Sequence, residues 1–196
     1  MRIAIDTAVA EDGRHRRSSD SRRRIVTAML TLIRDGNVSP KPPQVAAQAG
    51  VGLRTVFRHF EDMESLYREM AEQTAARILP VLLQPYRATG WRERLDELVE
   101  RRQLIYEDIL PLKNAASLVR YRSAFIMEDH RQHLLLERRT LQAILPDTIL
   151  RDAVLSHALE MSVSFQSWSH LRQEQKLSVT QARRTLGRLI RSLVPD

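Results

Sequence analysis

Two arginines one helical turn apart, Arg54 and Arg58, carry side chains that can read or grip DNA. A guanidinium can donate two parallel hydrogen bonds to O6 and N7 of guanine, or it can clamp a phosphate. Thr55 can donate to a phosphate or touch a thymine methyl group, and we expect His59 to meet the DNA backbone. We assign base reading chiefly to Arg54, although half or more of protein–DNA hydrogen bonds go to phosphate and sugar.

The segment around these arginines is predicted to fold as two short helices joined by a tight turn. Apolar residues at helical spacing indicate helices over residues 43–49 and 53–59, with a restart at Met63. Gly50 falls just past the first helix, where a left-handed cap is easiest for glycine. Val56 and Phe60 face inward at i, i+4. Two short helices with a glycine-containing turn predict a helix-turn-helix.

This segment resembles the DNA-binding signature of the TetR family of one-component bacterial repressors. The residues that match the signature are Val45, Ala46, Ala49, Gly50, Val51, Gly52, Arg54, Thr55, Val56, Phe57 and Phe60, with Glu64 and Leu66 in the next helix. Gly52 replaces the serine that normally caps the recognition helix, Met63 replaces a common lysine, and residues 41–43 stand where threonines are usual. Glycine remains a tolerable N-cap, and proline suits a first helical turn.

The residues predicted to contact DNA lie in the two helices and just before the first helix of the chain. They are Lys41, Gln44, Gly52, Leu53, Arg54, Thr55, Phe57, Arg58 and His59, with Arg22, Arg23 and Arg24 as phosphate contacts. Phe57 occupies the family's aromatic position, which implies packing against a phosphate or a base methyl group. Its alternative is partial burial within the head.

The positive charge is concentrated in the first third of the chain. Residues 1–60 hold 11 Lys/Arg against 5 Asp/Glu, and residues 61–196 hold 20 against 19, which together give the net charge of +7. A basic head on a near-neutral body is the electrostatic pattern of a DNA-binding protein. We expect residues 1–19 to form a disordered basic arm, and entry of this arm into the minor groove is left open.

The remaining sequence predicts an all-α protein, because neither strand alternation nor a hairpin turn occurs. The resemblance implies a helix-turn-helix head over residues 20–66 and a helical effector-binding and dimerisation domain over residues 67–196. A first helix ends at Asp35-Gly36-Asn37. The later helices are predicted over residues 64–79, 91–109, 112–128, 130–145 and 148–171, with a last helix capped by Ser178 and Gln181.

The last fifty residues resemble the C-terminal helix pair through which many TetR-type proteins dimerise. The residues assigned to the dimer interface are Leu155, Leu159, Val163, Leu186, Leu189, Ile190 and Leu193. A helix that is apolar over much of its circumference must be covered on two sides. The alternative is that both helices pack within one monomer. A homodimer would place two recognition helices on half-sites about one DNA turn, roughly 34–36 Å, apart.

The resemblance also implies a cavity for a small-molecule effector in the second domain. Its candidate lining residues are Tyr106, Tyr121, Phe125, Met161, Phe165 and Trp168. For each of them, ordinary core packing is the alternative. Effector binding would favour a separation of the heads that no longer fits the operator.

Other functions find little support in the sequence. The chain has no cysteine, no apolar run near the roughly 20 residues that span a bilayer and no signal-peptide pattern, so we expect a cytoplasmic protein. No phosphate loop, nucleophile elbow or zinc-protease motif occurs, so we expect no enzyme and no cofactor. His130 and His133 have one metal-compatible spacing but no third ligand, and we assign no metal.

These observations favour a transcriptional regulator, most simply an effector-released repressor that binds a palindromic double-stranded DNA operator as a dimer. The alternative is a small-molecule-binding or protein-interaction module whose head no longer binds specific DNA. The effector, the operator sequence, the target genes and the sign of regulation are not encoded in any pattern of the chain.

Overall fold

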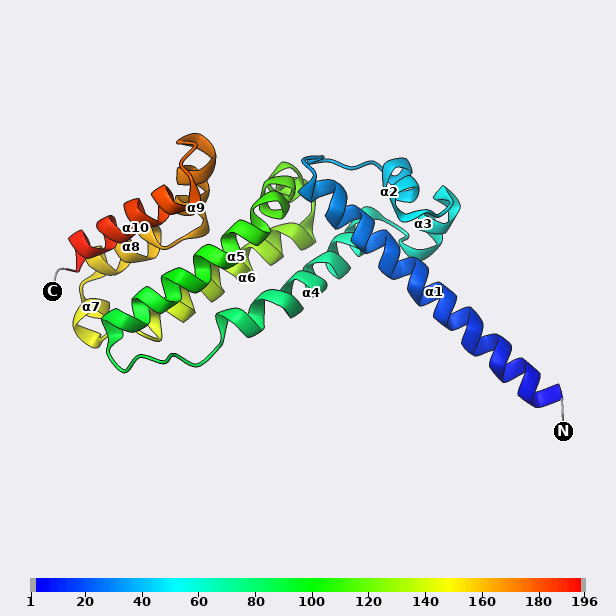
Figure 1. Ribbon diagram of the computed structural model, residues 1–196, viewed down its shortest axis with the longest axis horizontal. Coiled ribbons are helices and arrows are strands. Elements are labelled where there is room, and N and C mark those ends of the chain that lie inside the picture. The colour runs from blue at the N-terminus through cyan, green and yellow to red at the C-terminus, as the bar shows by residue number, and fades with distance from the viewer. Residues whose placement is uncertain (1–2, 195–196) are drawn as a thin grey trace. The chain divides into compact units, whose positions relative to one another are not determined.

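The computed structural model describes residues 3–194, with side chains from Ser18 onward. This part of the chain contains helices and no strand, so the predicted all-α class is confirmed (Figure 1). None of its helices combines the length and the apolar character needed to cross a membrane. The elements are α1 (Ile3–Arg34), α2 (Pro42–Ala49), α3 (Leu53–His59), α4 (Met63–Leu82), α5 (Trp91–Val119), η1 (Arg120–Arg122), α6 (Ala124–Gln142), α7 (Asp147–Arg151), α8 (Ala153–Ser162), α9 (Phe165–Ser169), η2 (His170–Glu174) and α10 (Val179–Leu193).

The chain divides into two compact units. The first takes in the chain up to Thr74 together with Pro111–Ile126, and the second takes in Ala75–Leu110 and the chain from Met127 onward. The sequence predicts a head that ends at residue 66, whereas the first unit extends further along α4 and includes the end of α5, η1 and the start of α6.

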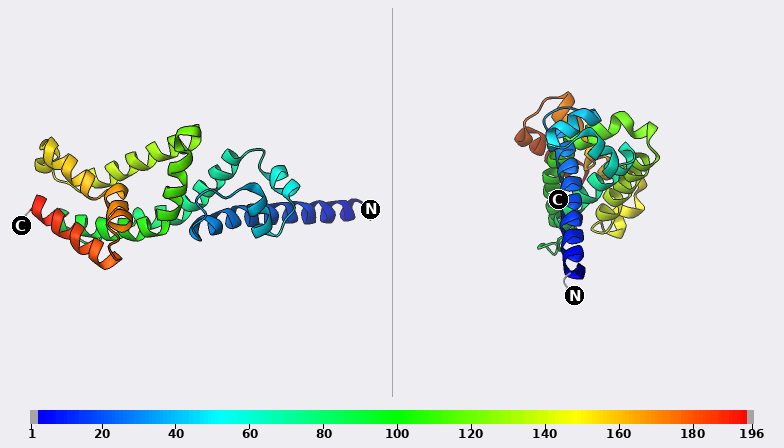
Figure 2. Two further views of the ribbon diagram at one scale, coloured as in Figure 1. Left: turned by 90° about the horizontal axis from the view of Figure 1, so that it is seen from above. Right: turned by 90° about the vertical axis from the view of Figure 1, so that its right-hand side faces the viewer.

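The core of the first unit forms where α2 and α3 pack against α1 (Figures 1 and 2). The C-terminal half of α1 contributes Ile25, Val26 and Met29, all nearly or fully buried. Small side chains on α2 allow its backbone to approach closely. The other buried members are Ala28, Leu30, Ile33, Val45, Ala46, Ala49, Val56, Phe60, Leu66, Met70 and Ala115. This core fixes the helix-turn-helix on α1.

Helix α1 begins at Ile3 and so includes most of residues 1–19, for which the sequence predicts a disordered basic arm. The side chains of residues 1–17, including the arginines at 14, 16 and 17, lie outside the described residues. Disorder of the arm and its entry into the minor groove therefore stay predictions.

The core of the second unit is larger and is centred on α5, α8 and α10. Leu98, Leu159 and Trp168 are fully buried there, and α8 packs against α10. The predicted cap of α10 is confirmed, because the Gln181 amide donates to Ser178 Oγ at 3.2 Å and the Ser178 amide donates to Gln181 Oε1 at 2.9 Å. Beyond this cap, α10 buries Ala182, Leu186 and Ile190 on one face, while its arginines are exposed.

Two predicted helix boundaries in the middle of the chain are wrong. Helix α5 continues through Pro111 to Val119, and α6 runs unbroken past Glu128 and Asp129. Proline lacks the amide that would bond the carbonyl one turn earlier, but a helix can tolerate this loss where its other contacts hold it. The break lies instead at η1 and Ser123. The backbone of Ser123 is extended, and its Oγ accepts from the Ile126 amide at 3.2 Å, so Ser123 starts α6.

The single helix predicted over residues 148–171 is also divided, because two side chains cap new helices inside it. Asp152 Oδ1 accepts from the Leu155 amide at 3.0 Å and begins α8. Ser164 Oγ accepts from the Ser167 amide at 3.2 Å and begins α9. A polar side chain that bonds the backbone in this way competes with continued helix. Helix α4, in turn, continues through Pro80 to Leu82.

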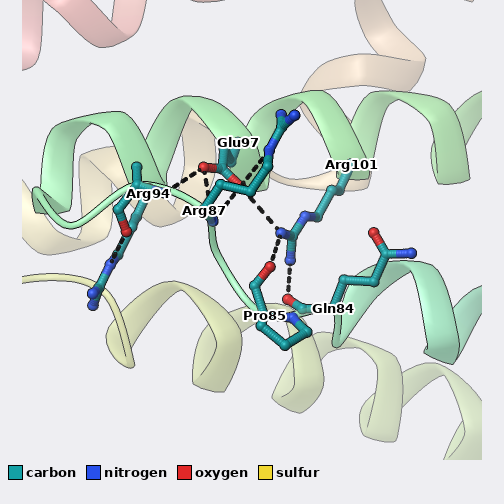
Figure 3. Close-up of polar contacts among 7 residues, drawn as sticks. Gln84, Pro85, Arg87, Arg94, Glu97 and Arg101 are labelled. Carbon is teal, nitrogen blue, oxygen red and sulfur yellow. Dashed lines mark hydrogen bonds and ion pairs between the residues drawn. The ribbon is translucent and has the colours of Figure 1, made fainter.

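The loop between α4 and α5 is held by one acidic side chain (Figure 3). Glu97 Oε1 accepts from the amides of Ala88 and Arg87 at 2.9 and 3.2 Å. Arg101 donates to the carbonyls of Gln84 and Pro85 and to Glu97 Oε2. The backbone hydrogen bond from Ala88, the largest of these influences, holds the pKa of Glu97 below its usual value. The backbone of the loop after α4 is therefore held by two side chains of α5, Glu97 and Arg101, which belong to the same unit.

Candidate nucleic-acid interface

The first helix of the motif is capped by a side chain that the sequence assigns to DNA. Gln44 Oε1 accepts the Lys41 amide at 2.8 Å, which satisfies one of the free amides at the start of α2. The Asn37 side chain also reaches Gln44, at 3.4 Å. Gln44 thus has a capping role, while Lys41 is exposed at the helix start and remains available to a phosphate.

The turn between α2 and α3 has the predicted left-handed glycine. Gly50 has φ +62° and ψ +39°, and its amide donates to the Ala47 carbonyl at 3.1 Å. The Val51 amide closes the turn on the Ala46 carbonyl at 3.0 Å. These bonds satisfy carbonyls that α2 would otherwise leave free. Gly52, extended at φ −71°, then precedes α3 without a side-chain cap.

Helix α3 has one buried face and one exposed face. Val56 and the following Phe60 are each 2% exposed and anchor the helix in the core. Arg54 and Arg58 lie on the exposed face, and Phe57 is 50% exposed between them. About half of Phe57 is exposed, which is compatible with contact to DNA and with the alternative of partial burial in the head. Of the other predicted contacts, Leu53 and Gly52 are exposed, whereas Thr55 and His59 are half-buried.

His59 is turned toward the protein at the end of α3. Its Nε2 is buried and has no hydrogen-bond partner among the described residues. Burial, followed by the charges of Arg58 and Arg22, lowers the pKa of His59, against the opposing influence of Glu69. The imidazole is consequently neutral near pH 7 and supplies no charge to a phosphate.

Arg22, Arg23 and Arg24, which directly precede the buried residues of α1, make different contacts. Arg22 bonds the His59 carbonyl and Glu69 within the unit, although its side chain is 43% exposed, so its phosphate contact stays a prediction. Arg23 is exposed and pairs with Asp20 at 2.7 Å. Arg24 is exposed close to Gly50, where a Cβ would lie 4.0 Å from its Nη1. A hollow of about 430 Å³ is lined by Asp20, Ser21, Arg23 and Arg24.

The six residues predicted to line an effector cavity are only partly brought together. Tyr106 and Phe165 make an edge-to-face contact with ring centroids 5.5 Å apart, and Trp168 is fully buried in the same core. Met161 is 65% exposed on α8. Tyr121, which is 79% exposed, and Phe125 belong to the first unit and not to this core.

The aromatic core of the second unit contains a polar network that sequence reasoning missed. Arg102 is 3% exposed, and it donates to Thr140 Oγ1 at 2.9 Å and to the carbonyls of Glu137 and Val163. Tyr106 Oη donates to Glu137 Oε1 at 2.7 Å. Burial raises the pKa of Tyr106 well above its usual value, so this hydroxyl remains a donor. In the sequence Arg102 stands between Arg101 and Gln103, and these polar neighbours give no sign of its burial.

A second polar group joins α5 to the end of α9. Glu107 accepts from Trp168 Nε1 and Arg172 Nε, both at 2.7 Å. Burial opposes ionisation of Glu107, but the hydrogen bonds from Arg172 and Trp168 outweigh it and hold the pKa of this carboxyl below its usual value. Trp168 is thus a hydrogen-bonded core residue, and its indole N–H is already satisfied.

Most of the predicted dimer residues are buried within the single chain. Leu159, Val163, Leu186 and Ile190 are all at most 4% exposed in the core of the second unit, because α8 and α10 pack on each other. Leu155 and Leu193 are partly buried against the same core, and Leu189 is 43% exposed. The exposed apolar residues of α8 are instead Val154, at 81%, and Met161.

No metal site accompanies these features. Within the described residues, no group of three or more His, Asp or Glu side chains could hold a metal ion. His133 Nδ1 instead lies 2.7 Å from the Asp129 carbonyl and 3.3 Å from its carboxylate.

Comparison with known proteins supports the fold. No sequence profile of a protein family matches the chain, and no curated protein matches it by sequence. Its structure is similar to the crystal structure of a transcriptional regulator from Rhodococcus sp. Rha1, with a TM-score of 0.67 and 16% sequence identity. The similarity covers 88% of this chain and 95% of the Rhodococcus chain, so this chain has the fold of that regulator over nearly its whole length.

Proposed function

We propose that this chain is a DNA-binding transcriptional regulator of the TetR type, and that α3 is its recognition helix. The observation that carries the proposal is the two-faced character of α3: Val56 and Phe60 fix it to the core, while Arg54, Phe57 and Arg58 are presented together on its exposed face. A helix of this kind can enter the major groove, where guanidinium groups read guanine or bind phosphates.

The near-complete structural similarity to a protein described as a transcriptional regulator supports this assignment. The charge distribution does so independently, because the excess of Lys and Arg over Asp and Glu lies almost entirely in residues 1–60. A regulator of this kind acts in the cytoplasm.

We further propose that the regulator acts as a homodimer on a palindromic operator, with α8 and α10 at the interface. Val154, His157 and Met161 recur at i, i+3 and i+7 on α8 and are all exposed. Leu189 adds an exposed apolar side chain on α10. This face replaces the buried leucines of the sequence prediction as the surface that a second copy would cover.

Regulation would come from an effector bound by the second unit. The polar and aromatic groups around Arg102, Tyr106 and Phe165 join α5, α6 and the segment between α8 and α9. An effector that binds one arrangement of these helices better than another would change the fraction of molecules whose DNA-binding heads fit the operator. Release of DNA on effector binding would make the protein a repressor.

The test is a selection of bound duplexes from a random DNA library, followed by a salt titration on the best sequence. A specific dimeric regulator should enrich a palindrome, and its affinity should fall steeply with salt, with a slope of about −0.9 for each phosphate contact. The selected sequence should be bound at least about a thousandfold more tightly than random DNA.

The alternative is a binding module whose head grips DNA weakly or not at all. Two observations give it weight: Gln44 and Arg22, both predicted to contact DNA, make contacts within the protein instead. Salt-sensitive binding without an enriched sequence would favour this alternative.

A further inference from the structure

Arg22 of α1 is the meeting point of three helices in the first unit. Its Nη1 donates to the main-chain carbonyl of His59, the last residue of α3, at 2.8 Å. Its Nε forms an ion pair with the carboxylate of Glu69 on α4. The guanidinium also lies over the Phe60 ring, with Cζ 4.5 Å from the ring centroid. One side chain therefore contacts the end of α3, the residue that follows it and α4.

The last carbonyls of α3, a helix of only seven residues, need a hydrogen-bond donor from elsewhere in the protein. These carbonyls have no amide one turn further on. Phe60 leaves the helix at once in an extended conformation, with φ −132° and ψ +104°, so no left-handed glycine satisfies them. A guanidinium on the His59 carbonyl supplies a charge-assisted hydrogen bond at the negative end of the helix dipole.

Glu69 fixes the direction of this guanidinium. Its side chain is 20% exposed, compared with 43% for Arg22, so the pair is partly shielded from solvent. A planar guanidinium can bond a carboxylate and a carbonyl at the same time, whereas an ammonium group cannot reproduce this fork. With Glu69 in place, the Arg22 guanidinium is directed to the end of α3.

We propose that Arg22, held by Glu69, is the positioning residue of the recognition helix. It contacts no DNA itself; it fixes the end of α3 so that Arg54 and Arg58 meet the major groove at the correct angle. The inference rests on the proposed function and adds to it a residue pair that controls specificity. It replaces the phosphate contact that the sequence predicts for Arg22.

The variant Glu69→Gln separates the two roles by the sign of its effect. If Arg22 were a phosphate contact, loss of the neighbouring carboxylate would free its charge and strengthen DNA binding. If Arg22 is a positioning residue, Glu69→Gln should weaken binding to the selected duplex by about tenfold, which corresponds to the loss of one charged hydrogen bond. Affinity for random DNA should stay unchanged or rise.

The variant Arg22→Lys tests the geometry while keeping the charge. We expect it to lose the same specificity as Arg22→Gln, because lysine cannot bridge His59 and Glu69 in one plane. The salt slope should stay at the wild-type value in Arg22→Gln, whereas loss of a phosphate contact would reduce it by about 0.9. Arg184→Gln, which removes an exposed arginine of α10 that is not assigned to DNA contact, is the matched control.

Hydrogen exchange gives a readout that needs no DNA. The Phe60 amide donates to the Val56 carbonyl at 2.9 Å at the end of α3. Its exchange should accelerate in Arg22→Lys and Glu69→Gln, while amides in the core of α1 keep their protection.

The outcomes separate the two proposals. Faster exchange together with lost sequence preference supports the positioning role. Unchanged exchange, rescue by lysine, or tighter binding of the selected duplex by Glu69→Gln overturns it. If the wild type enriches no sequence, the proposed function fails, and a role of Arg22 in positioning DNA-reading residues fails with it. The hydrogen exchange of the Phe60 amide would then still report whether Arg22 holds the end of α3.

Discussion

The buried guanidinium of Arg102 donates to the main-chain carbonyl of Val163 at 3.2 Å, across 61 positions of sequence. Val163 ends α8, so this bond ties the start of the α8–α9 turn to the middle of α5. The other acceptors of Arg102 are the Glu137 carbonyl and Thr140 Oγ1 on α6. A single side chain therefore joins three segments inside the core of the second unit.

Replacing Arg102 should destabilise the protein strongly. In Arg102→Met, the carbonyls of Glu137 and Val163 lose their charged donor and keep only the hydroxyl donors Thr140 and Tyr106, and we expect a decrease in the free energy of unfolding of about 2 to 4 kcal/mol. Urea denaturation measures this decrease. Arg139→Met, at an exposed position of α6, is the control and should change stability by no more than about 0.5 kcal/mol. Equal stability of the two variants would show that the Arg102 contacts contribute nothing.

The carboxylate of Glu107 should make stability depend on pH. Its folded-state pKa lies below the usual value of 4.5, so its contribution is fully present above about pH 4.5 and is lost as pH falls through the lower folded-state pKa. In Glu107→Gln this part of the acid destabilisation should disappear. Urea titrations between about pH 3 and pH 7, followed by tryptophan fluorescence, measure the difference. Glu100→Gln controls for the loss of a carboxylate, and identical pH profiles for both variants would contradict the prediction.

Two glycines should respond to alanine in opposite directions. Gly50 has φ +62°, and the nearest atom to a Cβ is 4.0 Å away, so Gly50→Ala costs backbone strain without a clash; we expect a loss of about 1 kcal/mol. Gly187 lies inside α10, and a Cβ there meets only the flexible end of Arg191 at 3.3 Å. Gly187→Ala should therefore stabilise the protein by about 0.5 to 1 kcal/mol. Thermal unfolding of both variants checks the signs, and a shift in the same direction would refute the argument.

The exposed face of α8 should control assembly. Two carboxylates introduced by Val154→Glu with Met161→Glu would have to be buried against a second copy, so the variant should sediment as a monomer. Both side chains are exposed in the single chain, and its fold should not change, as circular dichroism would show. Analytical ultracentrifugation gives the mass. A wild-type monomer, or a variant that remains dimeric, would exclude this face as the interface.

The helix-turn-helix could be predicted because its signals are local. Gly50 marks the turn by its position after α2, and Val56 and Phe60 mark the buried face of α3 by their spacing. The outward direction of Arg54 and Arg58 follows from the same periodicity. This part of the site required no knowledge of distant residues.

The errors arose where the decisive contacts are distant in sequence. Nothing near Arg22 in the sequence indicates that its guanidinium bonds Glu69, 47 positions later. Arg102 resembles any solvated arginine until α6 and the end of α8 supply its acceptors. The leucines of α8 and α10 match a dimer seam equally well as an internal core, and only their packing on each other decides between the two. Pro111 marked a false break because tertiary contacts override local propensity.

The most direct test of the proposed function compares duplex selection by the wild type, by Arg54→Ala and by Arg184→Ala. Arg184 is an exposed arginine of α10 and controls for the loss of one positive charge. We predict that the wild type and Arg184→Ala enrich the same palindrome, and that Arg54→Ala loses its base preference at one position in each half-site. Identical enrichment by all three would contradict base reading by Arg54, and the absence of any enriched sequence would contradict specific DNA recognition by this chain.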